Sequence, residues 1–397
     1  MQKENRVLSF TTFITSFGDW LSYFAWVVFL YKQSGSVAIA AYSVPLRSLA
    51  VGVGGWTGPY LMRFLSLRQI LVGTQLVSAA ILFFFAIAMG MGHAVSPAVA
   101  LGLVFFSTAM KQYFEMARET YSQGLGEVGH QRSLQAEILQ GLYSAQFLGP
   151  LFALGFLQIV PMGWIFVLDG TSFLISASLC ASLRGDRRAE TVRASSLRPL
   201  GYLRRYPGLL QIFLIRSMGY WIPISLFNYL LFSVVTDHYG LPVEHSAIIY
   251  ALTGLGSLVA AVNLRAGRSR AARWAATLSD AKLAFLALAV LAVTRFLLIE
   301  LPHFAWALLV LFISGLCNGV NAVTTQSLRR KLATPEQFPE VVGLELLVGK
   351  FFDWGVGTLA AAALLNHWLT YQSGMWLSAA LTLALAFLHL SARLRRV

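Results

Sequence analysis

The chain has 397 residues, of which 57% are hydrophobic and only 12% are charged. An average soluble domain carries about 25% charged residues, so this composition excludes an ordinary soluble protein and indicates one embedded in a membrane. The formal net charge of +13 would suggest a nucleic-acid partner in a soluble protein. Here the Lys and Arg residues lie in short segments between apolar runs, a pattern that sets membrane topology, so we expect no nucleic acid.

About twelve apolar runs are long enough to cross the hydrocarbon core as helices, since one crossing takes about 20 residues. The first six predicted spans are 7–30, 38–62, 68–90, 97–118, 134–158 and 162–183, and the last six are 208–235, 245–264, 279–299, 303–325, 341–365 and 372–392. An Arg-rich polar segment separates the two sets. We therefore predict an N-terminal six-helix bundle at 1–183, a cytoplasmic linker at 184–207 and a C-terminal six-helix bundle at 208–397.

Positive charge collects in alternate loops, beginning with Lys3 and Arg6 and continuing at Arg63 and Arg68. Because Lys and Arg in short loops resist translocation, these loops are predicted to be cytoplasmic. The predicted fold class is thus an all-α membrane protein whose N- and C-termini both lie in the cytoplasm.

The first span places a carboxylate, Asp19, near the middle of an apolar run. A charge at that depth costs a few kcal/mol in lipid, so it is expected to face a protein interior or an aqueous cavity. Antiparallel packing would bring Arg47 of the second span to a similar depth, which predicts an ion pair between the two. Two interpretations remain open: a pair kept for structure, or a carboxylate that exchanges a proton or a cationic substrate.

The fourth span carries Lys111, Gln112 and Glu115 in the stretch AMKQYFE. Lys111 and Glu115 are four residues apart, so they are placed to pair with each other on one helical face. Asp169 is expected near the outer end of the sixth span, with its polar contacts made locally.

The seventh span carries Arg216 and Tyr220 on one face, where an aromatic surface with one cation suits an amphiphile, although aromatic core packing is commoner. Asn318 belongs to a stripe of small polar residues on the tenth span, which serves helix association or a cavity equally well.

On the eleventh span, Lys350 and Asp353 are three residues apart and can neutralise each other, which favours structural pairing over substrate contact. Glu345 lies nearer the predicted cytoplasmic end, where we expect it to be solvated.

No cofactor or metal centre is expected. Cys180 and Cys317 lie in apolar runs without the spacing of a disulfide framework or a zinc site. Asp237, His238, Glu244 and His245 form a conceivable outer metal site, but the pattern is more typical of a solvated loop. The His residues lie mostly near predicted outer ends and do not converge with a carboxylate in the core, so an enzyme is not expected. A GxxxxGK[ST] loop is absent from the sequence, which favours an ion gradient as the driving force.

Several short motifs lie in the first and the fourth to sixth spans. They are Gly18 and Asp19 in SFGDW; Ala117 and Arg118 in MAR; Gly149 and Pro150 in LGP; and Asp169, Ser172 and Phe173 in LDGTSF. With the flanking sequence they resemble the major facilitator superfamily, most closely its secretion-effector group of macrolide efflux proteins and the enterobactin exporter. The resemblance covers the N-terminal half, whereas the C-terminal half matches in span layout and in TPEQFPEVVGLELL.

The loop between the second and third spans departs from that family. Gly58, Arg63 and Arg68 are retained, but Met62 stands where the family has an Asp that helps to latch the cytoplasmic gate. The resemblance implies gating roles for Arg63, Arg68, Arg118, Gly149 and Pro150. It also implies that this gate is latched differently or more loosely.

The resemblance implies a secondary active transporter in which two bundles rock about a central site. The expected activity is proton-coupled export of an amphiphilic small molecule such as a drug or siderophore, with Asp19 as the first candidate proton carrier. The expected contacts are Asp19, Arg47, Lys111, Gln112, Glu115, Arg216, Tyr220, Asn318, Lys350 and Asp353. An uptake carrier or a transporter of lipids or metal complexes is the alternative, and a receptor or intramembrane enzyme is less favoured. We expect a monomer in the lipid bilayer of the bacterial cytoplasmic membrane.

Overall fold

The computed structural model describes residues 2–34, 37–92, 95–123, 131–183, 198–242, 245–266, 277–332, 338–366 and 368–390. In the N-terminal half of this chain, six long helices follow one another: α1 (Gln2–Ser34), α2 (Val37–Phe64), α3 (Leu67–Gly90), α4 (Pro97–Gln123), α5 (Gln131–Ile159) and α6 (Met162–Ala181).

The C-terminal half begins with a short helix, α7 (Arg198–Arg205), which falls within the predicted linker. The next span is continuous from Pro207 to His238. It comprises α8 (Pro207–Leu214), a π-helical turn (Ile215–Tyr220), α9 (Trp221–Ser233) and a second π-helical turn (Val234–His238). Five further helices complete the fold: α10 (Ser246–Ala266), α12 (Asp280–Glu300), α13 (Phe304–Leu332), α14 (Phe338–Leu365) and α15 (Tyr371–Leu388).

Each of the twelve predicted spans therefore corresponds to a long helical segment of the described chain, with ends that differ by a few residues. Ten of these segments are long and apolar enough to cross a membrane by themselves. The two exceptions, α2 and α4, carry Arg47 and the Lys111–Glu115 face. The described part of the predicted linker is helical, and Leu203 of α7 packs into an apolar cluster with Leu209 and Phe213.

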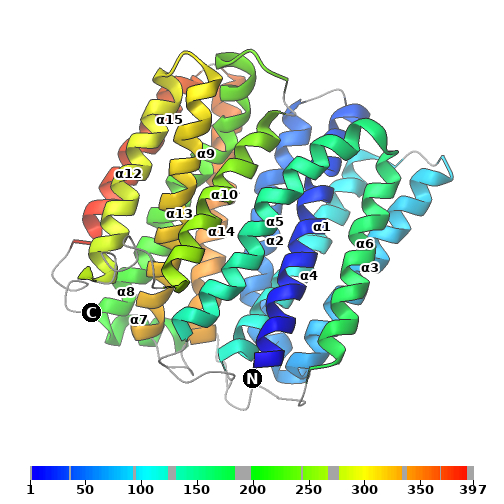
Figure 1. The fold of residues 1–397 in the computed structure, drawn as a ribbon, viewed down its shortest axis with the longest axis horizontal. Helices are drawn as coiled ribbons and strands as arrows, with labels where there is room; N and C mark the ends of the chain where they lie inside the picture. Colours follow the sequence, from blue (N-terminus) through cyan, green and yellow to red (C-terminus); the bar gives the residue numbers. More distant parts are fainter. Residues whose placement is uncertain are drawn as a thin grey trace.

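The helices form two groups that lie side by side (Figure 1). The groups meet chiefly where α2 packs on α14 and where α5 packs on α10. The start of α1 and the end of α15 lie toward the same end of the helices in Figure 1, as an even number of antiparallel segments requires.

Glycines allow the helices of the two groups to approach closely. A Cβ atom on Gly343 of α14 would lie 2.9 Å from the carbonyl oxygen of Gly55 on α2. Where α5 packs on α10, which is the second seam between the groups, a Cβ on Gly254 of α10 would lie 2.8 Å from the backbone of Gln146 and Phe147 on α5. Small residues at such crossings let backbones meet in a medium that offers no hydrophobic drive between helices.

A tight contact of the same kind joins α1 and α5 inside the first group. A Cβ on Gly149 would lie 2.5 Å from Cβ of Trp20. Pro150, next to it, is buried inside α5. The Gly-Pro pair therefore has a packing role at this crossing.

We predict that Gly149→Ala lowers the melting temperature of the purified protein, because overpacking a tight contact costs about 1–3 kcal/mol. The matched control is Gly155→Ala on the same helix, where an added Cβ meets nothing within 4 Å. That control should be neutral or stabilising, since Ala favours a helix over Gly by about 1 kcal/mol. Equal melting temperatures for the two variants would contradict the packing role.

Candidate functional site

The central carboxylate of α1 is paired with a lysine of α4. Lys111 Nζ lies 2.7 Å from Asp19 Oδ2. The predicted Asp19–Arg47 ion pair is thus wrong, and the alternative pairing of Lys111 with Glu115 is wrong as well. Sequence spacing gives neighbours on one helix, but only the packing of α1 against α4 decides which cation reaches Asp19.

Arg47 stacks on an aromatic ring. Its guanidinium carbon lies 4.9 Å from the centre of the Tyr23 ring, and its Nε has no hydrogen-bond partner among the described residues. Tyr23 in turn packs against Tyr250 of α10, with ring centres 6.3 Å apart. Arg47 therefore lies beside aromatic side chains from both groups of helices, with an unused donor.

Lys111 is deep among the helices, yet 32% of its side-chain surface is accessible, compared with 18% for Asp19. An accessible side chain in the interior of a bundle must border an internal opening. The ion pair therefore lies at the edge of a space between helices, as the sequence led us to expect.

Asp169 does not lie at an outer helix end as predicted, but against the middle of α1. It is 1% exposed, and a Cβ on Gly18 would lie 2.2 Å from its Oδ1. The expected local contact is present, because the Ser172 hydroxyl donates to the Asp169 backbone carbonyl (2.8 Å) and lies 3.4 Å from Oδ1. Gly18 and Asp169, from two separate motifs, thus form one contact.

A second charged cluster lies in the C-terminal group. Arg216 Nε and Arg329 Nη1 lie 3.3 Å and 3.1 Å from the same oxygen, Oε1 of Glu345. Glu345 is 1% exposed, so the prediction that it would be solvated is wrong. The two guanidinium groups compensate its buried negative charge. Both come from other helices, so the residue pattern of α14 alone does not predict them.

Arg216 and Tyr220 lie on the π-helical turn that interrupts the seventh span. The Arg216 guanidinium carbon is 4.8 Å from the Tyr220 ring centre, and the Tyr220 hydroxyl donates to Asn318 Oδ1 at 2.8 Å. Tyr143 of α5 is close enough to interact electrostatically with Arg216 and Tyr220. These three predicted residues therefore come together and face the N-terminal group.

The predicted pairing of Lys350 with Asp353 is confirmed, with Nζ 2.7 Å from Oδ2. Lys350 Nζ also lies 3.4 Å from the centre of the Trp221 ring. Sequence reasoning missed Ser48 of α2, whose hydroxyl donates to Asp353 Oδ2 at 2.7 Å. This hydrogen bond joins the two groups of helices, and no spacing pattern in the stretch around Ser48 marks it.

The remaining predicted contacts are less central. Gln112 is buried, and its Cβ would lie 2.9 Å from a Cβ on Gly54 of α2. Glu115 is half-buried and within electrostatic range of Lys111. In the loop considered as an outer metal site, His238 Nε2 lies 3.2 Å from the Leu301 carbonyl oxygen, while Glu244 falls outside the described residues.

The residues with implied gating roles have diverse surroundings. Arg118 is buried and donates to Thr12 Oγ1 at 3.0 Å, Arg63 stacks on Tyr60, and Arg68 is half-buried. Met62 is 2% exposed within an apolar cluster that includes Met116 and Phe114. An apolar contact therefore occupies the place at which the family that the sequence resembles has a charged latch.

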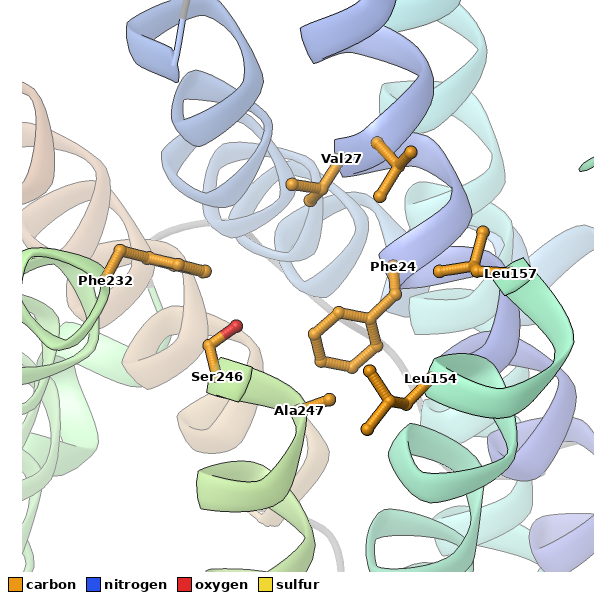
Figure 2. Close-up of a pocket in the computed structure, with 8 residues that line it drawn as sticks. Phe24, Val27, Leu154, Leu157, Phe232, Ser246 and Ala247 are labelled. Carbon is orange, nitrogen blue, oxygen red and sulfur yellow. The ribbon is translucent and has the colours of Figure 1, made fainter. Parts of the chain in front are cut away.

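A small apolar pocket of about 20 Å³ lies between the two groups, on the side of the C-terminal end of α1. Figure 2 shows Phe24, Val27, Leu154 and Leu157 facing Phe232, Ser246 and Ala247. Trp20, Tyr23, Phe24 and Tyr250 pack together between this pocket and the level of Asp19, with ring centres 5.2–6.5 Å apart.

Solved structures share this fold over nearly the whole chain. The human organic anion transporter MFSD10 (TETRAN) aligns with a TM-score of 0.74 and 15% identity, covering 98% of this chain and 99% of that one. The Escherichia coli fucose:proton symporter FucP aligns with a TM-score of 0.67 and 13% identity, covering 97% of each chain.

A bacterial homologue of the iron transporter ferroportin, in an outward-facing state, aligns with a TM-score of 0.67 and 14% identity, covering 97% of this chain and 98% of that one. No protein-family model matches the sequence, and no curated protein does. The chain thus has the major facilitator fold, in which two groups of six helices form one membrane protein.

We predict that Asp19→Asn lowers the melting temperature, because Lys111 loses its charged partner and an uncompensated group of this kind costs about 1–3 kcal/mol. The double variant Asp19→Asn/Lys111→Gln should recover most of that loss, since it removes both charges. Thermal melts of the two single variants and the double variant measure the coupling. If the change in melting temperature of the double variant equals the sum of the two single changes, the 2.7 Å contact contributes nothing to stability.

Proposed function

We propose that the protein is a secondary active transporter that works by alternating access. The observation that carries this proposal is the presence of charged and polar side chains inside the membrane-spanning helices of both groups. Asp19, Arg47 and Lys111 come from α1, α2 and α4, and Arg216, Asn318 and Asp353 come from the seventh, tenth and eleventh spans. Ionisable groups within a membrane usually mark a substrate or ion pathway.

The two seams between the groups suit a rocking motion. Apolar and glycine contacts dominate α2–α14 and α5–α10, and the Ser48–Asp353 hydrogen bond is a single polar contact that can form and break. A net hydrogen bond contributes about 1 kcal/mol, so it biases the conformational equilibrium without locking it. The gating roles of Arg63, Arg68, Arg118, Gly149 and Pro150 belong to this proposal.

The favoured substrate is an amphiphilic small molecule with an anionic group. Arg47 offers an unused donor beside the rings of Tyr23 and Tyr250, and a guanidinium binds a carboxylate through charge-assisted hydrogen bonds. The nearby apolar side chains of Phe24, Leu154 and Phe232 offer a surface for an apolar part of the molecule, although the pocket between them is small. The similarity in fold to a transporter described as carrying organic anions agrees with this choice.

We further propose export driven by a proton gradient, from a monomer in a bacterial cytoplasmic membrane with both termini inside. The motif resemblance of the N-terminal half favours export, whereas a structural neighbour is described as a fucose:proton symporter, so the fold by itself does not fix the mode of coupling. Direction is therefore a separate question from transport.

The proposed function is tested with the purified protein in proteoliposomes that carry a proton gradient of either sign. Panels of anionic, neutral and cationic amphiphiles are assayed for accumulation, and a pH-sensitive dye follows proton movement. Accumulation of an anionic amphiphile with opposite proton movement is expected. Absence of gradient-dependent movement for all three substrate classes would refute the proposal.

We predict that Arg47→Gln raises the KM for an anionic substrate about tenfold or more, since a hydrogen bond to a charged group contributes about 1.5–3 kcal/mol. The KM for an uncharged analogue of similar shape should change little. Arg204→Gln is the control, because Arg204 is an exposed arginine on α7 that has no part in the proposed site or gate. Equal effects of the Arg47 variant on charged and uncharged substrates would contradict the anion contact.

A further inference from the structure

Two carboxylates lie at the centre of the N-terminal group, and their surroundings differ. Asp19 has an ammonium group 2.7 Å away, at the edge of an internal opening. Asp169 is 1% exposed, and the groups placed to donate to its carboxyl are the hydroxyls of Ser172 and Ser22. One carboxylate is thus compensated by a cation, and the other only by neutral donors.

The packing around Asp169 leaves no room for a closer partner. Its Oδ1 lies where a side chain on Gly18 would be, so the carboxyl is pressed against the backbone of α1. Gly170, the next residue of α6, packs against the Phe83 ring of α3. Apart from the Ser22 hydroxyl and Asp19 of α1, the contacts around Asp169 and Gly170 are thus with backbone and an aromatic ring.

The charged groups near Asp169 are Asp19 on α1, Lys111 on α4 and Arg47 on α2. Lys111 is already paired with Asp19, and Arg47 is stacked on Tyr23. An ionised Asp169 would be buried without its own cation and beside a second negative charge. Burying a charge in this way costs far more than burying a neutral carboxylic acid that hydrogen-bonds to hydroxyl groups.

From this geometry we propose that Asp169, and not Asp19, holds the coupling proton, as a neutral carboxylic acid between α1 and α6. Asp19 stays ionised with Lys111. When the internal opening admits water, the proton leaves the Asp169 carboxyl for a water molecule. The carboxylate that results then competes with Asp19 for Lys111, which links proton release to the ion pair at the opening.

The coupling part of this inference rests on the proposed transport function, but the protonation state of Asp169 does not. Infrared difference spectroscopy on the full chain in lipid vesicles measures that state directly, since a protonated carboxyl gives a separate carbonyl stretching band. The wild type should show the band at neutral pH and lose it at high pH. Asp169→Asn should lack the band, whereas the double variant Asp19→Asn/Lys111→Gln, which removes both charges of the ion pair, should retain it.

A band that persists in Asp169→Asn, or one that disappears in the double variant Asp19→Asn/Lys111→Gln, would overturn the proposal. If Asp169→Asn does not fold, the wild type labelled with ¹³C at Asp carboxyls replaces it, together with Asp169→Glu. The band must then shift on labelling in the wild type and move off the aspartate frequency in Asp169→Glu; a band that does neither refutes the assignment.

Transport assays add a second test in proteoliposomes. Asp169→Asn should retain exchange of labelled for unlabelled substrate, which needs no net proton movement, and should lose accumulation driven by the proton gradient. Retained gradient-driven accumulation would contradict the proposal. A wild type that moves no substrate would refute the transport function alone, because the infrared band still decides where the proton lies.

Discussion

The structure depends on one constraint, which is that charges carried to the middle of a membrane-spanning fold must be compensated inside the protein. Asp19 meets it through Lys111, Glu345 through two arginines, and Asp353 through Lys350 and Ser48. Each solution draws on side chains from two or more helices. The charged centre therefore holds helices together as much as it offers a site to a ligand.

Arg47 and Asp169 are among the described ionisable residues without a comparable partner, and both inform the functional proposals. Arg47 relies on the face of Tyr23, which stabilises a cation without consuming its hydrogen-bond donors. Asp169 relies on hydroxyl groups, which can accompany either a neutral or an ionised carboxyl. Incomplete compensation is what a transport site requires, since a fully neutralised centre would have no interaction left for a substrate or a coupling ion.

The backbone makes this arrangement possible. Gly18 allows Asp169 to reach α1, Gly149 allows α5 to reach α1, and Gly55 with Gly343 brings α2 onto α14. Two of these glycines belong to motifs that the sequence analysis singled out as family features. Their role in the fold is close helix packing, with the side chains of neighbouring helices, and in one case a carboxyl, filling the place of the missing Cβ.

The sequence by itself determined the all-helical membrane class, the twelve spans and the local pair Lys350–Asp353. These follow from run length, hydropathy and spacing along one helix, all of which are local properties. It also identified most of the polar residues that meet at the centre. Tertiary structure alone decided that Lys111, and not Arg47 or Glu115, pairs with Asp19, that Glu345 is buried between two arginines, and that Ser48 reaches Asp353. The physical reason is that helix rotation and neighbour choice come from packing among twelve helices, which no single span encodes.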